Sequence, residues 1–399
     1  MNKTFCILPW VHTHLKPNGD MHLCSRKSIP IGNIFESNMT DLFNSEKMNY
    51  VRKKMTDGEE VVGCEKCYHL EKIGSFSLRL FSNWYFKKLL VENKVEEWGD
   101  DLYGVGERDV DINTDWLTEL KPIINRGPEI DWLGIHASNV CNLSCRGCYS
   151  MLSSKWKKDE KKLGINPYPL YDKDLNEFNI DFKKTKLITM FGGEPLYMKQ
   201  NDQLMDSLIK EDTVEETILQ YYTNGTILPN TKTLDVWKKL KKLQLFISID
   251  AYGTENDYFR NGSDWKTVEK NVLKFIDYAN QYSWELGTNT LINIYNIDRL
   301  EVLHNWLLDI GIKEEKIVYN LAIYPQELDI RNLPEDYKKQ LIEKVKKTPL
   351  HKDLIKLVVE QLKSEPNISF IATKGFSNKL DELRNQTNPF EPLKVFMND

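Results

Sequence analysis

The cysteines of this chain are few and unevenly placed, and they constrain its fold more than any other feature. There are seven in 399 residues: Cys6, Cys24, Cys64, Cys67, Cys141, Cys145 and Cys148. No apolar run approaches the roughly 20 residues that a membrane helix needs, and the first residues lack the apolar stretch and cleavage site of a secretory signal. We therefore expect a cytoplasmic protein without a membrane partner, whose reduced thiols bind metal rather than form disulfides.

Cys141, Cys145 and Cys148 are separated by three and then two residues, in the segment CNLSCRGC. A short loop of this spacing can place three thiolates around three irons of a 4Fe–4S cluster, which four cysteines usually hold. The fourth iron then keeps an open position, as a catalytic metal centre requires. The alternatives are a partial zinc site or three buried cysteines. Zinc prefers four ligands, and only His136 lies near enough in the sequence to complete the set.

From Trp132 onward, short apolar runs alternate with helical patterns such as 264–282 and 297–310. This alternation predicts βαβ units around a parallel sheet. We expect six such units, and hence an α/β fold in the form of a partial barrel or an open sheet. Polar or glycine-rich motifs follow the expected strands, at the sheet edge where parallel folds place their active sites. These candidate residues are Gly192, Gly193, Glu194, Asn224, Ser248 and Asp250.

The cysteine loop after a strand, with the motif GGEP (192–195) one βα unit later, resembles the radical S-adenosylmethionine (SAM) superfamily. The resemblance implies a partial (β/α)6 barrel in which SAM chelates the open iron and GGEP holds its amino group. An electron from the cluster would cleave SAM to a 5′-deoxyadenosyl radical, which abstracts a substrate hydrogen atom. A donor such as flavodoxin or ferredoxin would supply that electron. Gly147 departs from the family, which commonly has an aromatic residue there against adenine; Tyr149 is the nearest substitute.

Further barrel residues take roles from the same resemblance. Asn224, and Ser248 with Asp250, match positions that contact the ribose or the methionine carboxylate of SAM. The segment around Arg260 resembles the one that follows in members that modify peptides. For each residue alone, a turn or helix-capping role is the alternative, because Asn and Asp favour local hydrogen bonds.

The four N-terminal cysteines suit either a second 4Fe–4S cluster or a structural zinc ion. Cys64 and Cys67 form a C-x2-C pair, and Cys6 and Cys24 flank an expected hairpin. Their spacing alone does not choose between the two metals. The segment from Cys6 to Cys24 resembles the start of SPASM or twitch domains, which implies an auxiliary 4Fe–4S cluster. His69 is a candidate substitute ligand.

We expect four regions along the chain. They are an auxiliary cluster module at 1–74, a helical connector at 75–131, the barrel at 132–325 and a helical C-terminal tail at 326–399. Within them, the patterns predict a hairpin turn at 17–20 and helices at 39–56, 77–97 and 351–365.

The charge balance argues against nucleic acid as a partner. The formal net charge is -5, so a dominant basic patch is not expected. The lysine-rich segment 153–162 is interpreted as a solvated helix face. An RNA-modifying enzyme is disfavoured for the same reason.

The resemblance implies oxidative modification or cross-linking of a peptide or protein. Modification of a small metabolite such as a sugar, and a non-catalytic metal-binding scaffold, are the alternatives. The two clusters would use all seven cysteines. No thiol would then remain to return a hydrogen atom to a substrate radical, which favours oxidation over epimerisation by a free cysteine.

Overall fold

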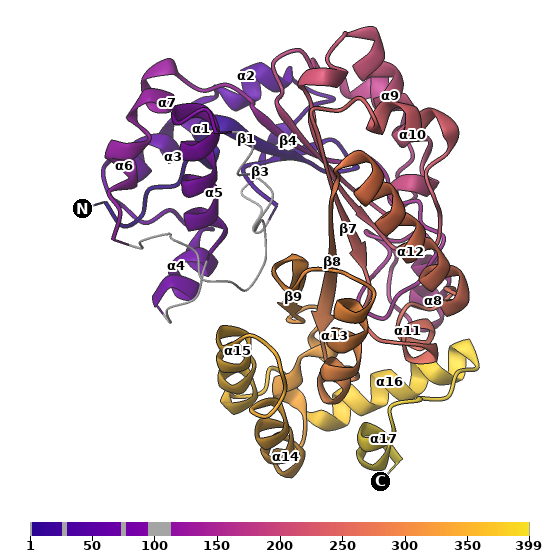
Figure 1. Cartoon of the computed structure of the whole chain (residues 1–399). Helices are drawn as coiled ribbons and strands as arrows, with labels where there is room; N and C mark the ends of the chain where they lie inside the picture. The colour runs from indigo at the N-terminus through magenta and orange to yellow at the C-terminus, as the bar shows by residue number, and fades with distance from the viewer. Residues whose placement is uncertain (1, 26–29, 73–76, 95–112, 399) are drawn as a thin grey trace.

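Nine strands form one sheet in the computed structural model, which describes residues 2–25, 30–72, 77–94 and 113–398. Their order is β3-β2-β1-β4-β5-β6-β7-β8-β9, and neighbours from β4 to β9 pair in parallel. These strands are β4 (Trp132–His136), β5 (Leu187–Phe191), β6 (Ile218–Thr223), β7 (Lys242–Ser248), β8 (Glu285–Ile292) and β9 (Ile317–Leu321). In Figure 1 the sheet curves into a wall that is open on one side. The partial barrel expected from the sequence is confirmed.

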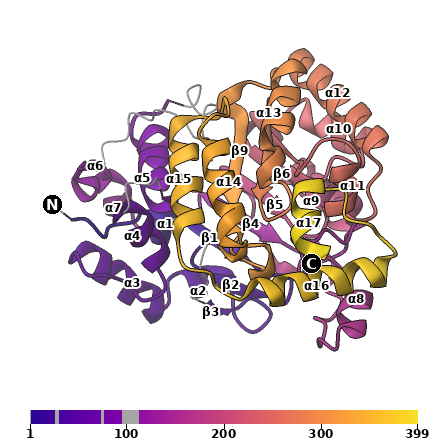
Figure 2. The same cartoon turned by 90° about the horizontal axis from the view of Figure 1, so that it is seen from below.

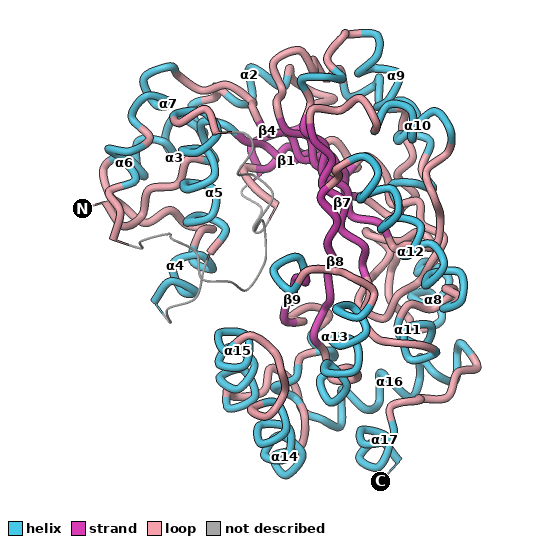
Figure 3. Tube along the Cα trace, viewed as in Figure 1, coloured by secondary structure: helices cyan, strands magenta, loops and turns pink. Residues whose placement is uncertain are grey.

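Helices between the strands cover the outer face of this wall (Figure 3). They include α9 (Lys199–Lys210), α10 (Thr231–Trp237), α11 (Thr254–Phe259), α12 (Trp265–Tyr282) and α13 (Leu300–Asp309). Helix α12 shows why they form. Its side chains Val268, Val272 and Phe275 recur at helical spacing and are buried, and the Asp264 side chain caps its first turn.

A hydrogen-bonded ladder crosses the barrel side of the sheet. Trp132 Nε1 donates to Thr189 Oγ1 at 2.8 Å, and that hydroxyl donates to Gln220 Oε1 at 3.0 Å. Gln220 Nε2 lies 3.3 Å from Gln244 Oε1, and Gln244 Nε2 donates to Glu285 Oε2 at 2.9 Å. Buried polar groups of this kind are costly unless paired, so the ladder specifies the register of five neighbouring strands and the level at which their loops leave the sheet.

The N-terminal module extends this sheet. The predicted hairpin is confirmed as β1 (His12–Leu15) and β2 (Asp20–His22), with Gly19 at φ 87°, and β3 (Pro30–Asn33) pairs with β2. Strand β1 also pairs in parallel with β4, with His14 opposite Gly134. The division of the chain at residues 74, 131 and 325 stays a prediction, and the β1–β4 pairing crosses the first two of these boundaries.

Helices of the N-terminal part pack around this hairpin and the neighbouring edge of the sheet. The helices are α1 (Leu8–Val11), α2 (Met39–Phe43), α3 (Glu46–Thr56), α4 (Glu65–Lys72), α5 (Leu78–Phe86), α6 (Trp116–Glu119) and α7 (Lys121–Arg126).

Two helix predictions in this region were wrong in detail. The helix expected at 39–56 is broken into α2 and α3, because the Ser45 side chain accepts from the Met48 N–H and starts a new helix. The helix expected at 77–97 begins as α5 but continues as a wider π-helical turn, η1 (Lys87–Val91). Residues 95–97 of that prediction lie outside the described residues.

The C-terminal tail is helical, as expected, and holds more helices than the one predicted at 351–365. That helix is α15 (Lys352–Lys363), and it is accompanied by α14 (Glu335–Val345), α16 (Phe370–Arg384) and α17 (Glu391–Asn398). Figures 1 and 2 show α16 running across one end of the barrel beside α8 (Trp156–Lys162). None of the described helices combines the length and apolarity needed to cross a membrane.

Candidate active site

The loops that carry the predicted site residues leave the sheet at one edge. Cys141 lies in the loop after β4, Gly192 follows β5, Asn224 follows β6 and Asp250 lies just after β7. Because these strands are parallel neighbours, their carboxyl ends meet at this edge. The structure therefore brings together motifs that lie far apart in the sequence.

Cys141, Cys145 and Cys148 form a small cluster with the buried Leu143. The Leu143 N–H donates to Cys141 Sγ at 3.4 Å, and Arg260 Nη1 lies 4.0 Å from Cys145 Sγ. Donors of this kind stabilise the thiolate, which is the form that binds metal. Burial raises the pKa of the Cys141 thiol to about 12, so its thiolate needs a metal as well. These residues fit a three-cysteine iron–sulfur cluster.

A site for one metal ion is a different arrangement. No three described His, Cys, Asp or Glu side chains converge closely enough to hold a single ion. A 4Fe–4S cluster binds each cysteine through a different iron, so its thiolates need not converge on one point.

Gly193 is the point at which the β5 loop meets the cysteine loop. A Cβ atom there would lie 2.0 Å from the Val140 carbonyl oxygen and 2.9 Å from Cys141 Cβ. The Gly193 N–H donates to the Ser138 carbonyl at 3.1 Å, and the Glu194 N–H donates to the Val140 carbonyl at 3.0 Å. This close approach requires glycine.

The Glu194 side chain is buried and directed at β6. One oxygen accepts from Thr223 Oγ1 at 2.7 Å and the other from the Asn224 N–H at 2.7 Å. The Leu196 N–H also donates to it, at 3.1 Å. Burial raises the pKa of this carboxyl group to about 7 against these hydrogen bonds. The carboxylate thus joins two loops of the site, and its predicted contact with the SAM amino group stays a prediction.

Asn224 connects the β6 loop to the cysteine loop. Its Nδ2 donates to Asn142 Oδ1 at 2.9 Å, and Asn142 Nδ2 donates to Thr226 Oγ1 at 2.8 Å. Asn142 directly follows Cys141, so the pair ties the first cysteine to the loop after β6, two strands away in the sheet.

Asp250 and Arg260 form a buried ion pair beside Cys145. Arg260 Nη2 lies 2.8 Å from Asp250 Oδ2, and the Leu291 N–H donates to Asp250 Oδ1 at 2.8 Å. Burial raises the pKa of the Asp250 carboxyl group, while the Arg260 charge opposes this rise. Sequence analysis selected both residues, and the structure joins them.

Tyr149 and Ser248 complete the predicted set. Tyr149 packs against Tyr324 and Tyr168, with ring centroids 5.2 and 6.1 Å away. A Cβ on Gly147 would lie 3.0 Å from Leu291 Cδ2 and 3.2 Å from the Phe259 ring, which explains the absence of an aromatic residue at 147. Ser248 is half-buried at the end of β7. The contacts of Tyr149 and Ser248 with SAM stay predictions.

Three of the four N-terminal cysteines, Cys6, Cys64 and Cys67, lie close enough to influence one another electrostatically. Cys6 is buried, and electrostatic interaction with Cys64 and Cys67 raises the pKa of its thiol further after burial itself. Cys64 and Cys67 flank the start of α4, and the Cys67 N–H donates to the Cys64 carbonyl at 3.1 Å. Cys24 follows β2, at the open end of the hairpin whose other strand leads back to Cys6. His69 is exposed on α4.

Sequence analysis missed the role of the lysine-rich segment 153–162. Only one face of α8 is solvated; Trp156, Asp159 and Glu160 are buried. Trp156 Nε1 donates to the Cys145 carbonyl at 2.7 Å, so this helix supports the cysteine loop. The signal available in the sequence was Trp156, a large apolar residue at the start of the lysine-rich segment.

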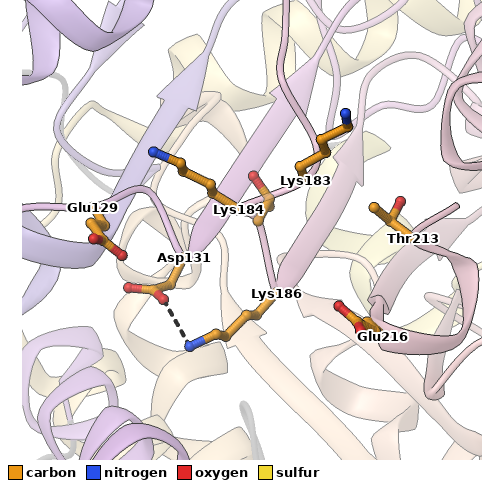
Figure 4. A pocket seen from close by; sticks show the side chains of 8 residues that line it. Glu129, Asp131, Lys183, Lys184, Lys186, Thr213 and Glu216 are labelled. Carbon is orange, nitrogen blue, oxygen red and sulfur yellow. Dashed lines mark ion pairs between the residues drawn. The ribbon is translucent and has the colours of Figure 1, made fainter. Parts of the chain in front are cut away.

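A hollow of about 260 Å³ lies at the opposite edge of the sheet, where β4, β5 and β6 begin (Figure 4). Its charged lining consists of three lysines and three acidic residues: Lys183, Lys184, Lys186, Glu129, Asp131 and Glu216. Lys186 Nζ lies 3.3 Å from Asp131 Oδ1. The hollow is not part of the predicted site, because it lies at the opposite end of the strands from the cysteine loop.

Comparison with known families agrees with this placement. Residues 135–307 match the model of the radical SAM superfamily, and residues 6–68 match the SPASM model, an iron–sulfur cluster-binding domain. The first match contains the three-cysteine loop and the second contains the N-terminal quartet. Together they imply a SAM-binding 4Fe–4S cluster and an auxiliary iron–sulfur cluster, as the sequence predicted.

Two curated relatives share part of their length with the chain. An uncharacterized protein of Methanocaldococcus jannaschii is 26% identical over 184 residues, which are 45% of this chain and 59% of that protein. The radical SAM cyclopropyl synthase TigE of Paramaledivibacter caminithermalis is 24% identical over 207 residues, which are 47% of this chain and 42% of the synthase. The chain therefore spans roughly half of each relative.

Solved structures that match part of this chain include SuiB of Streptococcus suis bound to SAM. It is 13% identical, with a TM-score of 0.35, over 86% of this chain and 67% of SuiB. Another is anSMEcpe with bound SAM and a peptide named Cp18Cys. It is 16% identical, with a TM-score of 0.36, over 53% of this chain and 58% of that chain.

Proposed function

Because the chain belongs to the radical SAM superfamily and carries a SPASM domain ahead of its barrel, we propose that it oxidatively modifies or cross-links a peptide or protein. The reaction would begin with reductive cleavage of SAM and abstraction of a substrate hydrogen atom. An external donor such as flavodoxin or ferredoxin, in the cytoplasm, would supply the electron. The observation that carries the proposal is the convergence of Cys141, Cys145 and Cys148 with Gly193 and the Asp250–Arg260 pair at one edge of the parallel sheet.

Each element of this edge has a task in the proposed reaction. When bound, the cluster at the cysteine loop supplies the electron that cleaves SAM to a 5′-deoxyadenosyl radical, and the auxiliary cluster supplies an acceptor for the electron left on the substrate. Gly193 lets the two loops approach closely enough to form one binding surface. Arg260 holds positive charge against Cys145 Sγ, and Asp250 orients it.

A row of aromatic side chains lies just below this edge, and we place the peptide side chain of the proposed reaction against it. The aromatic rings of Phe191, Tyr222 and Phe246 stack across three strands, with centroids 5.7 and 5.2 Å apart. They lie one layer closer to the site loops than the ladder of Thr189, Gln220 and Gln244. Stacked aromatic faces favour apolar or aromatic groups, which a peptide side chain provides.

Two further observations support the choice of oxidation. The two proposed clusters use all seven cysteines, which leaves no thiol as a hydrogen donor. One relative is named a cyclopropyl synthase, and closing such a ring forms a carbon–carbon bond. The segment around Arg260 resembles peptide-modifying members, which supports a peptide over a sugar.

Anaerobic reconstitution followed by addition of SAM and dithionite tests the proposal. We expect the protein to hold about eight irons, four for each cluster, and to release 5′-deoxyadenosine. Changing Cys141, Cys145 and Cys148 together to Ala should remove about half of the iron and abolish release. The control, Cys64 and Cys67 changed to Ala, should lose the other half and keep SAM cleavage. Release by the triple variant would refute the assignment.

A peptide substrate requires a second measurement. The reconstituted protein is incubated with a peptide library, and masses are compared before and after turnover. A peptide product two hydrogens lighter supports the proposal. A change found only in a small-metabolite pool would contradict it.

A further inference from the structure

Helix α16, in the C-terminal tail, contacts a fully buried arginine of the cysteine loop. Arg146 directly follows Cys145 and is 0% exposed. Its Nη2 forms an ion pair with Asp381 on α16 and donates to Gln386 Oε1 at 3.1 Å. Its Nε donates to the Tyr258 carbonyl at 3.2 Å. Residues more than two hundred positions away thus bind the residue between two cluster ligands.

Asp381 is itself held in place. The Tyr258 hydroxyl lies 2.9 and 3.0 Å from its two carboxylate oxygens, and the Arg146 guanidinium lies 3.8 Å from the Tyr258 ring centroid. One turn earlier on α16, Ser377 Oγ lies 2.6 Å from the Tyr295 hydroxyl. The carboxylate therefore has a defined position relative to the loop.

A second ion pair binds the other side of the loop. Arg384, one turn after Asp381, donates from Nε to Asp159 Oδ2 at 3.0 Å on α8. Its guanidinium lies 4.6 Å from the ring centroid of Trp156, whose Nε1 donates to the Cys145 carbonyl at 2.7 Å. Helix α16 therefore holds the loop directly at Arg146 and indirectly through α8.

Packing alone does not account for these contacts. Burying an ion pair costs desolvation energy, and apolar residues at such positions often give the folded protein equal or greater stability. The Arg384 charge on α16 acts on the Cys145 thiol, and nearby charge tunes the reduction potential of iron–sulfur clusters. Arg146 adds a second buried positive charge, carried by the loop between Cys145 and Cys148. Asp381 compensates that charge, and Gln386 touches the same guanidinium without adding charge.

We propose that α16 is part of the SAM-cluster site and that Asp381 is a positioning residue that orients Arg146 and sets the reduction potential of the cluster through it. The inference rests on the proposed function, because it requires a cluster at Cys141, Cys145 and Cys148.

An EPR-monitored redox titration of the full-length reconstituted protein tests this, following the signal that changes when SAM is added. Asp381→Asn removes one negative charge and should raise the midpoint potential. Gln386→Glu adds one at nearly the same place and should lower it. Asp381→Glu keeps the charge and should restore a potential near that of the wild type. The control is Asp298→Asn, which breaks the Lys344–Asp298 pair between α14 and the barrel and should leave the potential unchanged.

The two charge variants keep the test decisive. If Asp381→Asn does not fold, the downward shift in Gln386→Glu alone supports the proposal and an unshifted potential in that variant overturns it. If both fold with the potential of the wild type and of Asp298→Asn, α16 is only structural. A wild-type protein with iron but no SAM-responsive signal would instead refute the proposed function.

Discussion

At the scale of single residues, Gly193 has the most demanding environment of the site. The space that a Cβ would occupy is taken by the Val140 carbonyl and by Cys141 Cβ. A methyl group must therefore push the β5 loop and the cysteine loop apart. The position of Cys141, the first proposed cluster ligand, depends on this one residue having no side chain.

Gly193→Ala should lower the iron content by about four per chain, one cluster, and abolish 5′-deoxyadenosine release. The matched control is Gly375→Ala. Gly375 lies in α16, with nothing within 4 Å of an added Cβ, and alanine should stabilise that helix by about 0.5–1 kcal/mol. Iron analysis and thermal unfolding of both variants make the comparison. A fully loaded, active Gly193→Ala protein would show that the loops can separate without cost.

At the scale of elements, the four cysteines proposed to hold the auxiliary cluster come from three separate pieces of the N-terminal module. Cys6 precedes α1, Cys24 follows β2, and Cys64 and Cys67 flank the start of α4. The hairpin brings the first two toward one end, and α4 supplies the other two. In chain order, one cysteine precedes the hairpin, one follows it, and the C-x2-C pair comes last, so the chain can surround a cluster from three sides.

Cys24→Ala should remove the auxiliary cluster and leave SAM cleavage intact, because Cys24 is the proposed fourth ligand. His69→Ala is the control; His69 is exposed on α4 and should not affect the iron content. Elemental analysis distinguishes the outcomes and also tests the metal itself. One zinc and no auxiliary iron in the wild type, or iron loss in His69→Ala alone, would require a different ligand set.

At the scale of the whole molecule, buried histidines line the junction between the N-terminal hairpin and the barrel. His12 and His136 are 1% and 3% exposed. Burial lowers the pKa of each to about 3, and the Lys16 charge adds to the effect at His136. His14, whose pKa is also lowered by burial, lies on the same face of the sheet. The folded junction therefore holds its histidines uncharged.

Lowering the pH should destabilise this junction. From about pH 6.5 downward the unfolded chain binds protons at His12 and His136, whereas the folded protein does so only near about pH 3. The free energy of unfolding should therefore decrease as the pH is lowered through that window, by up to ~1.4 kcal/mol per pH unit for each histidine. Denaturant titrations should give a shallower pH slope for His136→Asn than for the wild type. Equal slopes for the two proteins would contradict the assignment.

The sequence predicted the parts of this structure that depend on short-range pattern. The six barrel strands, the hairpin and the cysteine loop follow from apolar runs and spacing. The Arg146–Asp381 pair does not, because its partners are 235 residues apart and a single arginine or aspartate carries no periodic signal. The β1–β4 pairing was missed for a related reason: the hairpin pattern predicts that β1 pairs with β2, and it does not indicate which distant strand covers the other edge of β1.

The β1–β4 pairing also has a consequence for biosynthesis. His12 and Trp132, which it places side by side, are 120 residues apart. On the ribosome the N-terminal hairpin emerges first, but its partner strand is not yet made, so one edge of β1 stays open in the nascent chain. Open strand edges pair readily with other chains. A fragment ending at residue 74 would carry the auxiliary cysteines without the strand that covers them, and we expect it to aggregate.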